Sequence, residues 1–221
     1  MRIAGVDDAG RGSVLGPLVI AGVLMDEKDL QRLSELGVKD SKRLSRQRRE
    51  KLCEEIKKLV LKYHVVKLSP AEIDEVVRSG RKLHKLNRLE AQTMARVIDF
   101  LQPDIAYVDA SDVLAERYKY HIMEHLSFNL KIISEHKADI NYPIVSAASI
   151  IAKVERDRVI SELTAKYGNM GCGYATDSQT LEFLEKWIKK FGSYPDFVRL
   201  SWKTVKRIKE KQRQPKQRSL K

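Results

Sequence analysis

The sequence predicts an α/β fold with a mixed central sheet in one domain. Segments rich in β-branched residues alternate with amphipathic segments of helical period, and the first two strand-like segments follow each other directly. The 221 residues are 43% apolar, which is enough to fill one core. No repeat of fixed period and no Gly/Ser linker divides the chain. Helices are therefore expected on both faces of the sheet.

Five apolar segments have the composition of strands. The first two are rich in β-branched and small apolar residues and are punctuated by glycine, and the later ones are short apolar runs. Ile105–Asp109 is almost wholly apolar before its carboxylate, as expected of a buried strand. We expect strands at Ile3–Asp7, Pro17–Met25, Val65–Leu68, Ile105–Asp109 and Asn129–Ser134.

Helices are indicated by capping residues and by apolar residues at helical spacing. Ser45 precedes a long amphipathic segment, and Ser69-Pro-Ala-Glu has the pattern of a capping box. Pro103 ends one helix, and Pro143 occupies the first turn of the longest one. We expect helices at about Lys28–Leu36, Ser45–Tyr63, a short one from Ser69, Leu86–Leu101, Ala115–Leu126, Pro143–Tyr167, Ser178–Lys190 and Trp202–Lys211.

The formal net charge of +12 is concentrated in two segments. Residues 39–51 contain seven basic and two acidic residues, and residues 199–221 contain ten basic and one acidic residue. Localised positive charge predicts a polyanionic partner, with nucleic acid as the first candidate. The alternative is that both runs are solvated helix faces. Residues 208–221 are basic and poor in apolar residues, so we expect a disordered tail.

Composition also argues against several classes of protein. The longest charge-free apolar stretch, Val14–Met25, has twelve residues, whereas a membrane span needs about 18 or more. Asp7 and Asp8 interrupt the N-terminus before a secretion signal could form. Cys53 and Cys172 lack metal-binding or disulfide-framework spacing and are expected to be reduced thiols. We therefore expect a cytoplasmic protein with no membrane partner.

Acidic residues stand at the ends of two predicted strands and before the longest helix. Asp7 and Asp8 end the first strand, Asp109 ends a later one, and Asp139 precedes the helix from Pro143. Groups at the carboxyl ends of strands collect at one edge of an α/β sheet. Carboxylates without nearby His or Cys suit Mg²⁺ or Mn²⁺, and with a basic surface they predict two-metal phosphodiester chemistry. Each acid taken alone could instead be a turn residue or an N-cap.

Eight short motifs are spread along the chain from Ile3 to about Arg207. They are G-V-D-D-A-G-R-G at 5–12, L-G-P at 15–17, V-K-D-S-K-R-L at 38–44, Y-V-D at 107–109, H-K-A-D at 136–139, V-S-A-A-S-I-I-A-K-V-E-R-D at 145–157, G-C-G-Y-A-T-D at 171–177 and W-K-T at 202–204. In this order they resemble the ribonuclease HII family, and its archaeal members most closely. No single motif would suffice, but eight in order make a chance resemblance improbable.

This resemblance implies a ribonuclease H-like three-layer fold with a helical C-terminal extension. It divides the chain into a catalytic core at 1–168, the extension at 169–207 and a basic tail at 208–221. It also implies an endoribonuclease that cuts the RNA strand of RNA–DNA hybrids and cuts 5′ of ribonucleotides embedded in duplex DNA, leaving 5′-phosphate and 3′-hydroxyl ends. Two divalent ions, Mg²⁺ or Mn²⁺, would be held by the four family carboxylates. Those carboxylates correspond here to Asp7, Asp8, Asp109 and Asp139.

The resemblance further implies a set of substrate contacts. The Gly-Arg-Gly loop would sense the ribose 2′-hydroxyl, and a tyrosine would pack on the following sugar. Two lysines would contact phosphates, and two serines near a helix N-terminus would add donors, although the serines could equally be packing residues. The corresponding residues are Gly10, Arg11, Gly12, Lys42, Ser146, Ser149, Tyr174 and Lys203.

The main departure from the family pattern is Asp8, where the family has glutamate. A shorter side chain could disturb Mg²⁺ coordination, so one alternative is a nucleic-acid-binding protein with an impaired active site. Another nuclease of the same fold, such as a junction resolvase, would share the metal chemistry without explaining the Gly-Arg-Gly loop. Ser13 replaces a proline, and Ala175-Thr176 replaces a Pro-Ser pair, both in loops.

Two remaining features concern histidines and the C-terminus. We expect His136 to be a structural hydrogen-bonder, and we expect the other histidines, His64, His84, His121 and His125, at the surface or its boundary. Gln217-Arg218-Ser219-Leu220 has the Q-x-x-L start of a sliding-clamp docking peptide but lacks its aromatic pair, so any clamp contact is expected to be weak. We expect a monomer.

Overall fold

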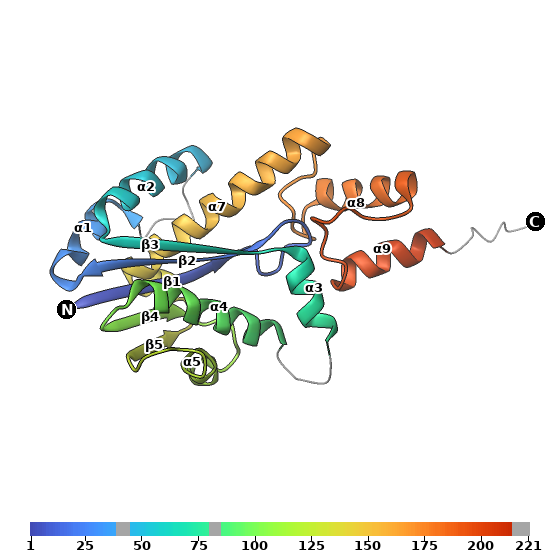
Figure 1. Cartoon of the computed structure of the whole chain (residues 1–221). Helices are drawn as coiled ribbons and strands as arrows, with labels where there is room; N and C mark the ends of the chain where they lie inside the picture. The colour runs from blue at the N-terminus through green and yellow to red at the C-terminus, as the bar shows by residue number, and fades with distance from the viewer. Residues whose placement is uncertain (39–44, 80–84, 214–221) are drawn as a thin grey trace, which may run out of the picture.

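The structure is a computed structural model that describes residues 1–38, 45–79 and 85–213. Its centre is a five-stranded sheet in the order β3-β2-β1-β4-β5, in which β1 is antiparallel to β2 and parallel to β4 (Figure 1). The mixed sheet confirms the predicted fold class. The strands are β1 (Arg2–Ala9), β2 (Leu18–Asp26), β3 (Lys62–Leu68), β4 (Ile105–Asp109) and β5 (Lys131–Glu135).

Helices connect these strands and continue beyond the last of them. A short 3₁₀ helix (Glu27–Asp29) leads into α1, and the predicted Ser69 capping box opens α3, since the Ser69 and Glu72 side chains each bond the other's backbone N–H. The helices are α1 (Leu30–Glu35), α2 (Arg46–Leu59), α3 (Pro70–Arg78), α4 (Lys85–Leu101), α5 (Ala115–Met123), α6 (Ala138–Asn141), α7 (Pro143–Tyr167), α8 (Ser178–Phe191) and α9 (Lys203–Arg213).

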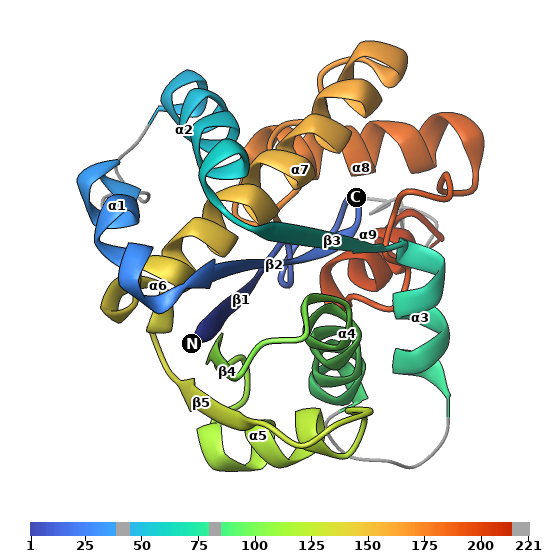
Figure 2. The same ribbon diagram turned by 60° about the vertical axis from the view of Figure 1, so that its left-hand side comes forward.

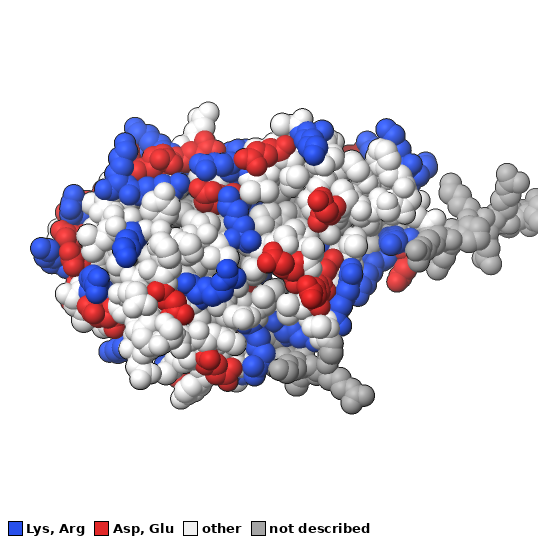
Figure 3. Space-filling model, viewed as in Figure 1, with Lys and Arg blue, Asp and Glu red and all other residues white. Residues whose placement is uncertain are grey.

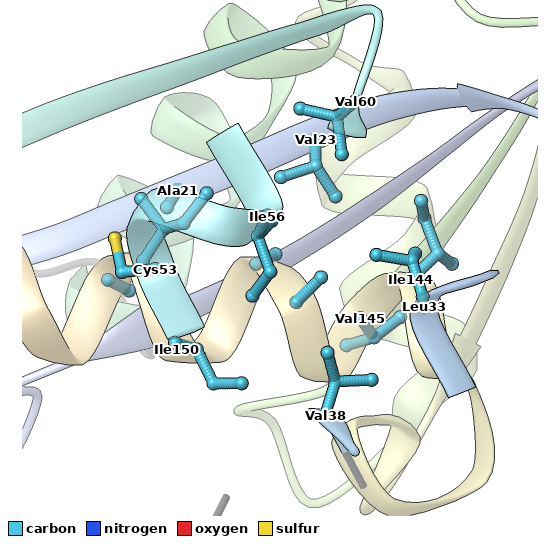
Figure 4. Close-up of a cluster of buried hydrophobic side chains, with 14 of the residues drawn as sticks. Ala21, Val23, Leu33, Val38, Cys53, Ile56, Val60, Ile144, Val145 and Ile150 are labelled. Atoms are coloured by element: carbon cyan, nitrogen blue, oxygen red, sulfur yellow. The ribbon is translucent and has the colours of Figure 1, made fainter. Parts of the chain in front are cut away.

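Three layers are visible in Figure 2, with α1, α2 and α7 on one face of the sheet and α4 and α5 on the other. Alternate residues of each strand therefore enter different cores. The first core packs Ala21 and Val23 of β2 against Ile56 of α2 and Val145 of α7 (Figure 4). The second core packs the opposite strand face against α4 and α5. Asp7 lies on the α7 side, and Asp8 is oriented toward α4.

A third apolar cluster joins the C-terminal helices to the rest of the molecule. Leu15 of the loop after β1 packs with Phe183 of α8 and Val205 of α9, and an isolated bridge pairs Leu15 with Val198. This contact places the loop between β1 and β2 directly against the C-terminal helices. The division of the chain at residue 168 stays a prediction.

Most predicted elements are present with ends shifted by one to three residues, and two differences are larger. The helix after Ser45 ends at Leu59 and not near Tyr63, because Lys62 and Tyr63 pair with β2 as the start of β3. The short helix α6, which contains Asp139, was not predicted. Its four residues give too little periodicity to be recognised in a sequence.

The two basic segments lie apart on the surface. Residues 46–51 belong to α2 and residues 203–213 to α9, which are well separated in both ribbon views (Figures 1 and 2). On the face seen in Figure 3, basic and acidic side chains are interspersed. Residues 39–44 and 214–221, which complete both segments, lie outside the described residues. In the described part of the chain, no helix has both the length and the apolar composition to cross a membrane.

Candidate active site

The parallel pairing of β1 and β4 brings two of the predicted acids together. Val6 is the partner of Val108 in this register, so Asp7 and Asp109 follow at adjacent positions on neighbouring strands. Both side chains lie on the face covered by α7, since Tyr107 packs into that core two residues before Asp109. The sheet itself therefore creates a pair of neighbouring carboxylates.

Asp7 is the most deeply placed of these acids, with 5% of its surface exposed. Its Oδ1 accepts a hydrogen bond of 2.7 Å from the N–H of Asp8. Burial, followed by the negative charges of Asp8 and Asp109, raises the pKa of Asp7 well above its ordinary value, while the Ser149 hydroxyl favours the ionised form. Three carboxylates thus repel one another at the end of β1.

Asp8 has a more polar environment. Its Oδ1 accepts a 3.1 Å hydrogen bond from the Ser111 hydroxyl, in the loop after β4. Burial raises the pKa of Asp8 to about 6, and Ser111, Arg11 and Lys153 oppose that shift. Asp8 therefore has two cations, Arg11 and Lys153, in its surroundings.

Asp139 enters the region through α6. The preceding N–H, that of Ala138, donates a 2.7 Å hydrogen bond to Oδ1 of Asp109, and Asp139 itself is 7% exposed. This bond attaches the first turn of α6 to the end of β4. Asp139 lies in the first turn of α6, whose N-cap is Lys137. The alternative prediction that Asp139 is an N-cap was therefore wrong.

The donor set fits a divalent cation in its chemistry. Burial and neighbouring negative charge raise the pKa values of Asp7 and Asp8, so a bound cation would stabilise their ionised forms, and oxygen donors without His or Cys suit a hard ion. Within the described ranges, no three His, Cys, Asp or Glu side chains are yet gathered into a set that could hold a metal. The acids are thus neighbours whose side chains do not form a finished ligand set.

The Gly10–Gly12 loop leaves β1 directly beside these acids. Gly10 has φ +85°, and a Cβ there would lie 2.8 Å from the Pro17 carbonyl oxygen, so this position requires glycine. A Cβ on Gly12 would meet nothing within 4 Å. Among the described residues, neither Arg11 nor Gly12 donates a backbone hydrogen bond. The tip of the loop therefore presents open backbone.

The Arg11 side chain extends toward α4, on the side of the sheet that Asp8 also faces. Its Nε lies 2.9 Å from both carboxylate oxygens of Glu90, and its Nη2 donates a 2.6 Å hydrogen bond to Oδ1 of Asn87. The guanidinium is thus engaged inside the protein. The predicted ribose contact was assigned to the loop and its backbone, and it stays a prediction.

Tyr174 lies in a second loop against the first. It forms an isolated bridge with Ser13, and its ring lies 4.6 Å from the guanidinium carbon of Arg156. Nη2 of Arg156 also donates to the Ser13 hydroxyl at 3.3 Å and to the Cys172 carbonyl at 2.5 Å. Gly173, with φ +85°, allows this contact because a Cβ there would lie 2.8 Å from Nη2. Arg156 therefore supports the tyrosine from beneath.

The other predicted contacts occupy different environments. Ser146 is fully buried and donates to the Val38 carbonyl at 2.5 Å, which is the packing role left open by the sequence. Ser149 is also fully buried, facing Asp7. Lys203 is exposed at the start of α9, and Lys42 lies outside the described residues.

The histidines and cysteines follow the predictions with one exception. His136 contacts the carbonyls of Ala110 and Val113 at 3.3 and 3.2 Å, which confirms a structural hydrogen-bonder. His121 was wrongly predicted at the surface, because it lies on the core-facing side of α5 with 7% exposure. His84 lies outside the described residues. Cys53 and Cys172 are free thiols, as expected.

Four residues around the site were not singled out from the sequence. Glu90 could have been found, because a glutamate stands on the core-facing stripe of a helix at helical spacing from Met94 and Val97. The others carried no local signal, since each bonds to a segment distant in sequence. These are Ser111, Arg156 and Arg199.

Comparison with known proteins identifies the family. Residues 4–205 match the family described as Ribonuclease HII. The ribonuclease HII of Thermococcus sibiricus is 48% identical over 221 residues, covering 99% of this chain and 96% of that protein. The chain belongs to the ribonuclease HII family.

Solved structures agree with this assignment. The ribonuclease H2 of Pyrococcus horikoshii superposes with a TM-score of 0.90 at 45% identity, covering 97% of this chain and all of that chain. The ribonuclease HII of Archaeoglobus fulgidus, solved in complex with PCNA, gives a TM-score of 0.85 at 46% identity and covers 96% and 97% of the two chains. Membership makes this chain an endoribonuclease, so the sequence resemblance is confirmed.

Proposed function

We propose that this ribonuclease HII is a divalent-metal-dependent enzyme that cuts the RNA strand of RNA–DNA hybrids. We further propose cleavage on the 5′ side of a ribonucleotide embedded in duplex DNA, leaving 5′-phosphate and 3′-hydroxyl ends. The observation that carries the proposal is the group of mutually repelling acids, Asp7, Asp8 and Asp109. They lie beside a loop in which the N–H groups of residues 11 and 12 have no partner among the described residues.

The residues that would hold two Mg²⁺ or Mn²⁺ ions are Asp7, Asp8, Asp109 and Asp139. Such ions supply an activated water and stabilise the departing oxygen. The protein orients the carboxylates in advance: Ser111 holds Asp8, and the Ala138 N–H holds Asp109. These two contacts fix Asp8 and Asp109, and the four side chains would complete the ligand set when the ions bind.

Substrate selection belongs to the two loops in this proposal. The open N–H groups of Arg11 and Gly12 can bond a 2′-hydroxyl, which is the group that distinguishes RNA from DNA. The Tyr174 ring, held by Arg156, offers a flat face for a sugar. Lys203, exposed at the start of α9, would contact a phosphate without reading sequence.

A sliding-clamp contact through the tail is a further part of the proposal. Its support is the Archaeoglobus fulgidus relative solved with PCNA, together with the Q-x-x-L pattern of residues 217–220. Binding of an archaeal clamp to the full chain is expected to be lost when residues 217–220 are replaced by alanines. Equal binding of both forms would remove this part of the proposal.

The test of the activity uses a short DNA duplex with one ribonucleotide and the same duplex in DNA only. We expect cleavage of the first duplex with Mg²⁺ or Mn²⁺, none in EDTA, and none of the DNA duplex. Phosphatase treatment should shift the downstream product, because that product carries the 5′-phosphate. No cleavage with either ion at high enzyme concentration would instead favour a binding protein with an impaired site.

Asp7→Asn and Asp109→Asn supply the matched controls. Each should abolish cleavage while leaving duplex affinity within about a few fold, because binding rests on basic side chains and chemistry on the carboxylates. Affinity is measured by fluorescence anisotropy in the same buffer. Equal losses of affinity and cleavage would contradict this separation.

A further inference from the structure

The contact between Arg11 and Glu90 lies directly beneath the Gly10–Gly12 loop. Glu90 is fully buried in α4, and both of its carboxylate oxygens lie 2.9 Å from Nε of Arg11. Asn87, one turn earlier on α4, takes the other end of the guanidinium at 2.6 Å. Arg11 is thus held at two points of its planar guanidinium by residues of one helix.

An acid at the position of Glu90 is unfavourable for packing alone. The same side of α4 is otherwise occupied by apolar side chains such as Met94 and Val97. Replacing a buried polar pair by apolar residues is often neutral or stabilising, so core stability does not require a glutamate here. The carboxyl group of Glu90 instead fixes the orientation of the Arg11 side chain.

The loop is fixed from its other side as well. Nη1 of fully buried Arg199 donates a 2.8 Å hydrogen bond to the Arg11 carbonyl, and its Nε donates to the Gly16 carbonyl at 3.1 Å. The N–H of Ser13 closes the turn onto the Gly10 carbonyl at 3.2 Å. Residue 11 is therefore held by side chain and by carbonyl, while its N–H finds no acceptor in the described part of the chain.

Asn87 extends the same connection to the segment after β4. Its Nδ2 donates a 2.9 Å hydrogen bond to buried Asp112, which accepts from the Leu114 N–H at 3.1 Å. That segment also carries Ser111, the hydrogen-bond donor to Asp8. One face of α4 thus links the loop at the predicted ribose position to the loop that orients an acid.

We propose that Glu90 and Asn87 are positioning residues for ribonucleotide selectivity. Through Arg11 they fix the backbone N–H groups of residues 11 and 12 at the distance that a 2′-hydroxyl requires. Arg11 itself does not reach the substrate, because its guanidinium is engaged by α4. This inference rests on the proposed function, and it assigns selectivity to a helix that need not touch nucleic acid.

The experiment compares Glu90→Leu, Glu90→Gln and Asn87→Ala with wild type. The readouts are kcat and KM on the single-ribonucleotide duplex, and Ki of the DNA-only duplex as a competitor. We expect Glu90→Leu and Asn87→Ala to raise KM and to lower the ratio of Ki to KM by about tenfold, the size of one strong hydrogen bond. The Ki of the DNA-only duplex should stay unchanged, because DNA has no 2′-hydroxyl and so makes no contact that these substitutions could remove.

Glu90→Gln serves as the conservative variant, because its amide keeps an acceptor oxygen for Arg11. It should retain the Ki-to-KM ratio within about twofold. Glu155→Leu is the matched control for removal of a buried acid: Glu155 on α7 bonds Lys57 and Lys67 at 3.2 and 3.0 Å. This control should lower the melting temperature and leave the ratio unchanged.

A merely structural role would give a different result. In that case Glu90→Leu and Asn87→Ala would lower the melting temperature but leave the ratio as in wild type, and this would overturn the inference. If Glu90→Leu does not fold, half-buried Asn87 still decides the question. Failure of the wild-type enzyme to cleave the ribonucleotide duplex would contradict the proposed function instead.

Discussion

Asp8 and Asp7 are adjacent in sequence, yet their surroundings differ. Asp7 is buried among carboxylates, whereas Asp8 has a hydroxyl donor in Ser111 and cations in Arg11 and Lys153. An aspartate at position 8 is thus stabilised by its neighbours although the family pattern has glutamate. Because Asp8 is supported in this way, an impaired active site is not the favoured interpretation.

Asp8→Glu tests the consequence of the shorter side chain. If Asp8 leaves an ion under-coordinated, the added methylene should raise Mg²⁺-supported cleavage and narrow any advantage of Mn²⁺. The gain should appear in turnover at limiting metal, with little change in substrate affinity. A metal titration of both forms on the ribonucleotide duplex measures this. A neutral or harmful effect would mean that Ser111 and its neighbours already compensate for the aspartate.

Glu90 should make stability depend on pH. Burial, followed by the charge of Asp8, raises the pKa of Glu90 to about 8 from an ordinary value of 4.5. The folded state therefore keeps a proton that the unfolded state releases, so the contribution to stability is full below about pH 4.5 and lost as the pH rises through 8. Glu90→Gln removes this titration.

Denaturant unfolding in EDTA at about pH 5, 7 and 8.5 measures that effect. The free energy of unfolding of Glu90→Gln, relative to wild type, should increase with pH across this range. Asp7 and Asp8 titrate in both proteins, and the charge of Asp8 acts in the same direction as the expected increase, because it disfavours ionised Glu90 in wild type only. A pH-independent difference would show that Glu90 is ionised in the folded protein.

At the scale of elements, the site forms where loops with unusual backbone meet rigid helices. The loop after β1 is held by α4 on one side and by Arg199 on the other, and the loop of Tyr174 is held by Arg156 of α7. The loop conformations need glycines with positive φ, while the helices supply long side chains that reach them. The glycines therefore allow the backbone conformation of each loop, while long side chains hold the loop in its place on the protein.

Substitutions of Gly10 and Gly12 distinguish a glycine needed for the loop conformation from one at the open tip of the loop. Gly10→Ala should destabilise the protein by about 1–2 kcal/mol or more, because its φ is positive and the Pro17 carbonyl blocks a Cβ. Gly12→Ala should change stability by less than about 0.5 kcal/mol, since nothing lies within 4 Å. If the backbone of residues 11 and 12 contacts the ribose, Gly12→Ala should nonetheless lose most cleavage activity, because the added methyl group would occupy space that the sugar needs.

Thermal unfolding and single-turnover cleavage of the ribonucleotide duplex check both variants. Full activity of Gly12→Ala would place the ribose contact elsewhere. Loss of stability in Gly12→Ala comparable with that in Gly10→Ala would mean that the tip is packed and not open.

At the scale of the whole molecule, the loop that follows the acids of β1 contacts the C-terminal helices. Leu15 and Val198 join the loop after β1 to the C-terminal segment, in the cluster that also holds α8 and α9. The basic segments on α2 and α9 are well apart, so they cannot form one compact patch (Figures 1 and 2). An extended polyanion such as a duplex could contact both.

Removal of Gln212–Lys221 tests the electrostatic part of that view. It deletes four of the basic residues, so the slope of log K against log salt should become shallower by up to about 0.9 for each phosphate that the shortened chain no longer neutralises. The decrease in affinity should be largest at low salt. Duplex binding measured at several salt concentrations gives the slope. An unchanged slope would mean that the tail does not bind phosphates.

Local signals in the sequence determined the secondary structure and the position of the acids. The Ser69 capping box, the apolar run before Asp109 and the helix from Pro143 each rest on neighbouring residues, and the structure reproduces them. Parallel strands then bring Asp7 and Asp109 together, as strand-end acids in an α/β sheet are expected to do. This much follows from short-range chemistry and a general rule of topology.

Only the tertiary structure decided what each side chain of the site contacts. Arg11 bonds Glu90 across 79 positions, Arg156 bonds Ser13 across 143, and Arg199 bonds the Arg11 carbonyl across 188. No local pattern encodes such pairs, because they depend on how helices pack on the sheet. Packing therefore makes the Arg11 side chain an internal support for the loop, a role that no local pattern in the sequence indicated.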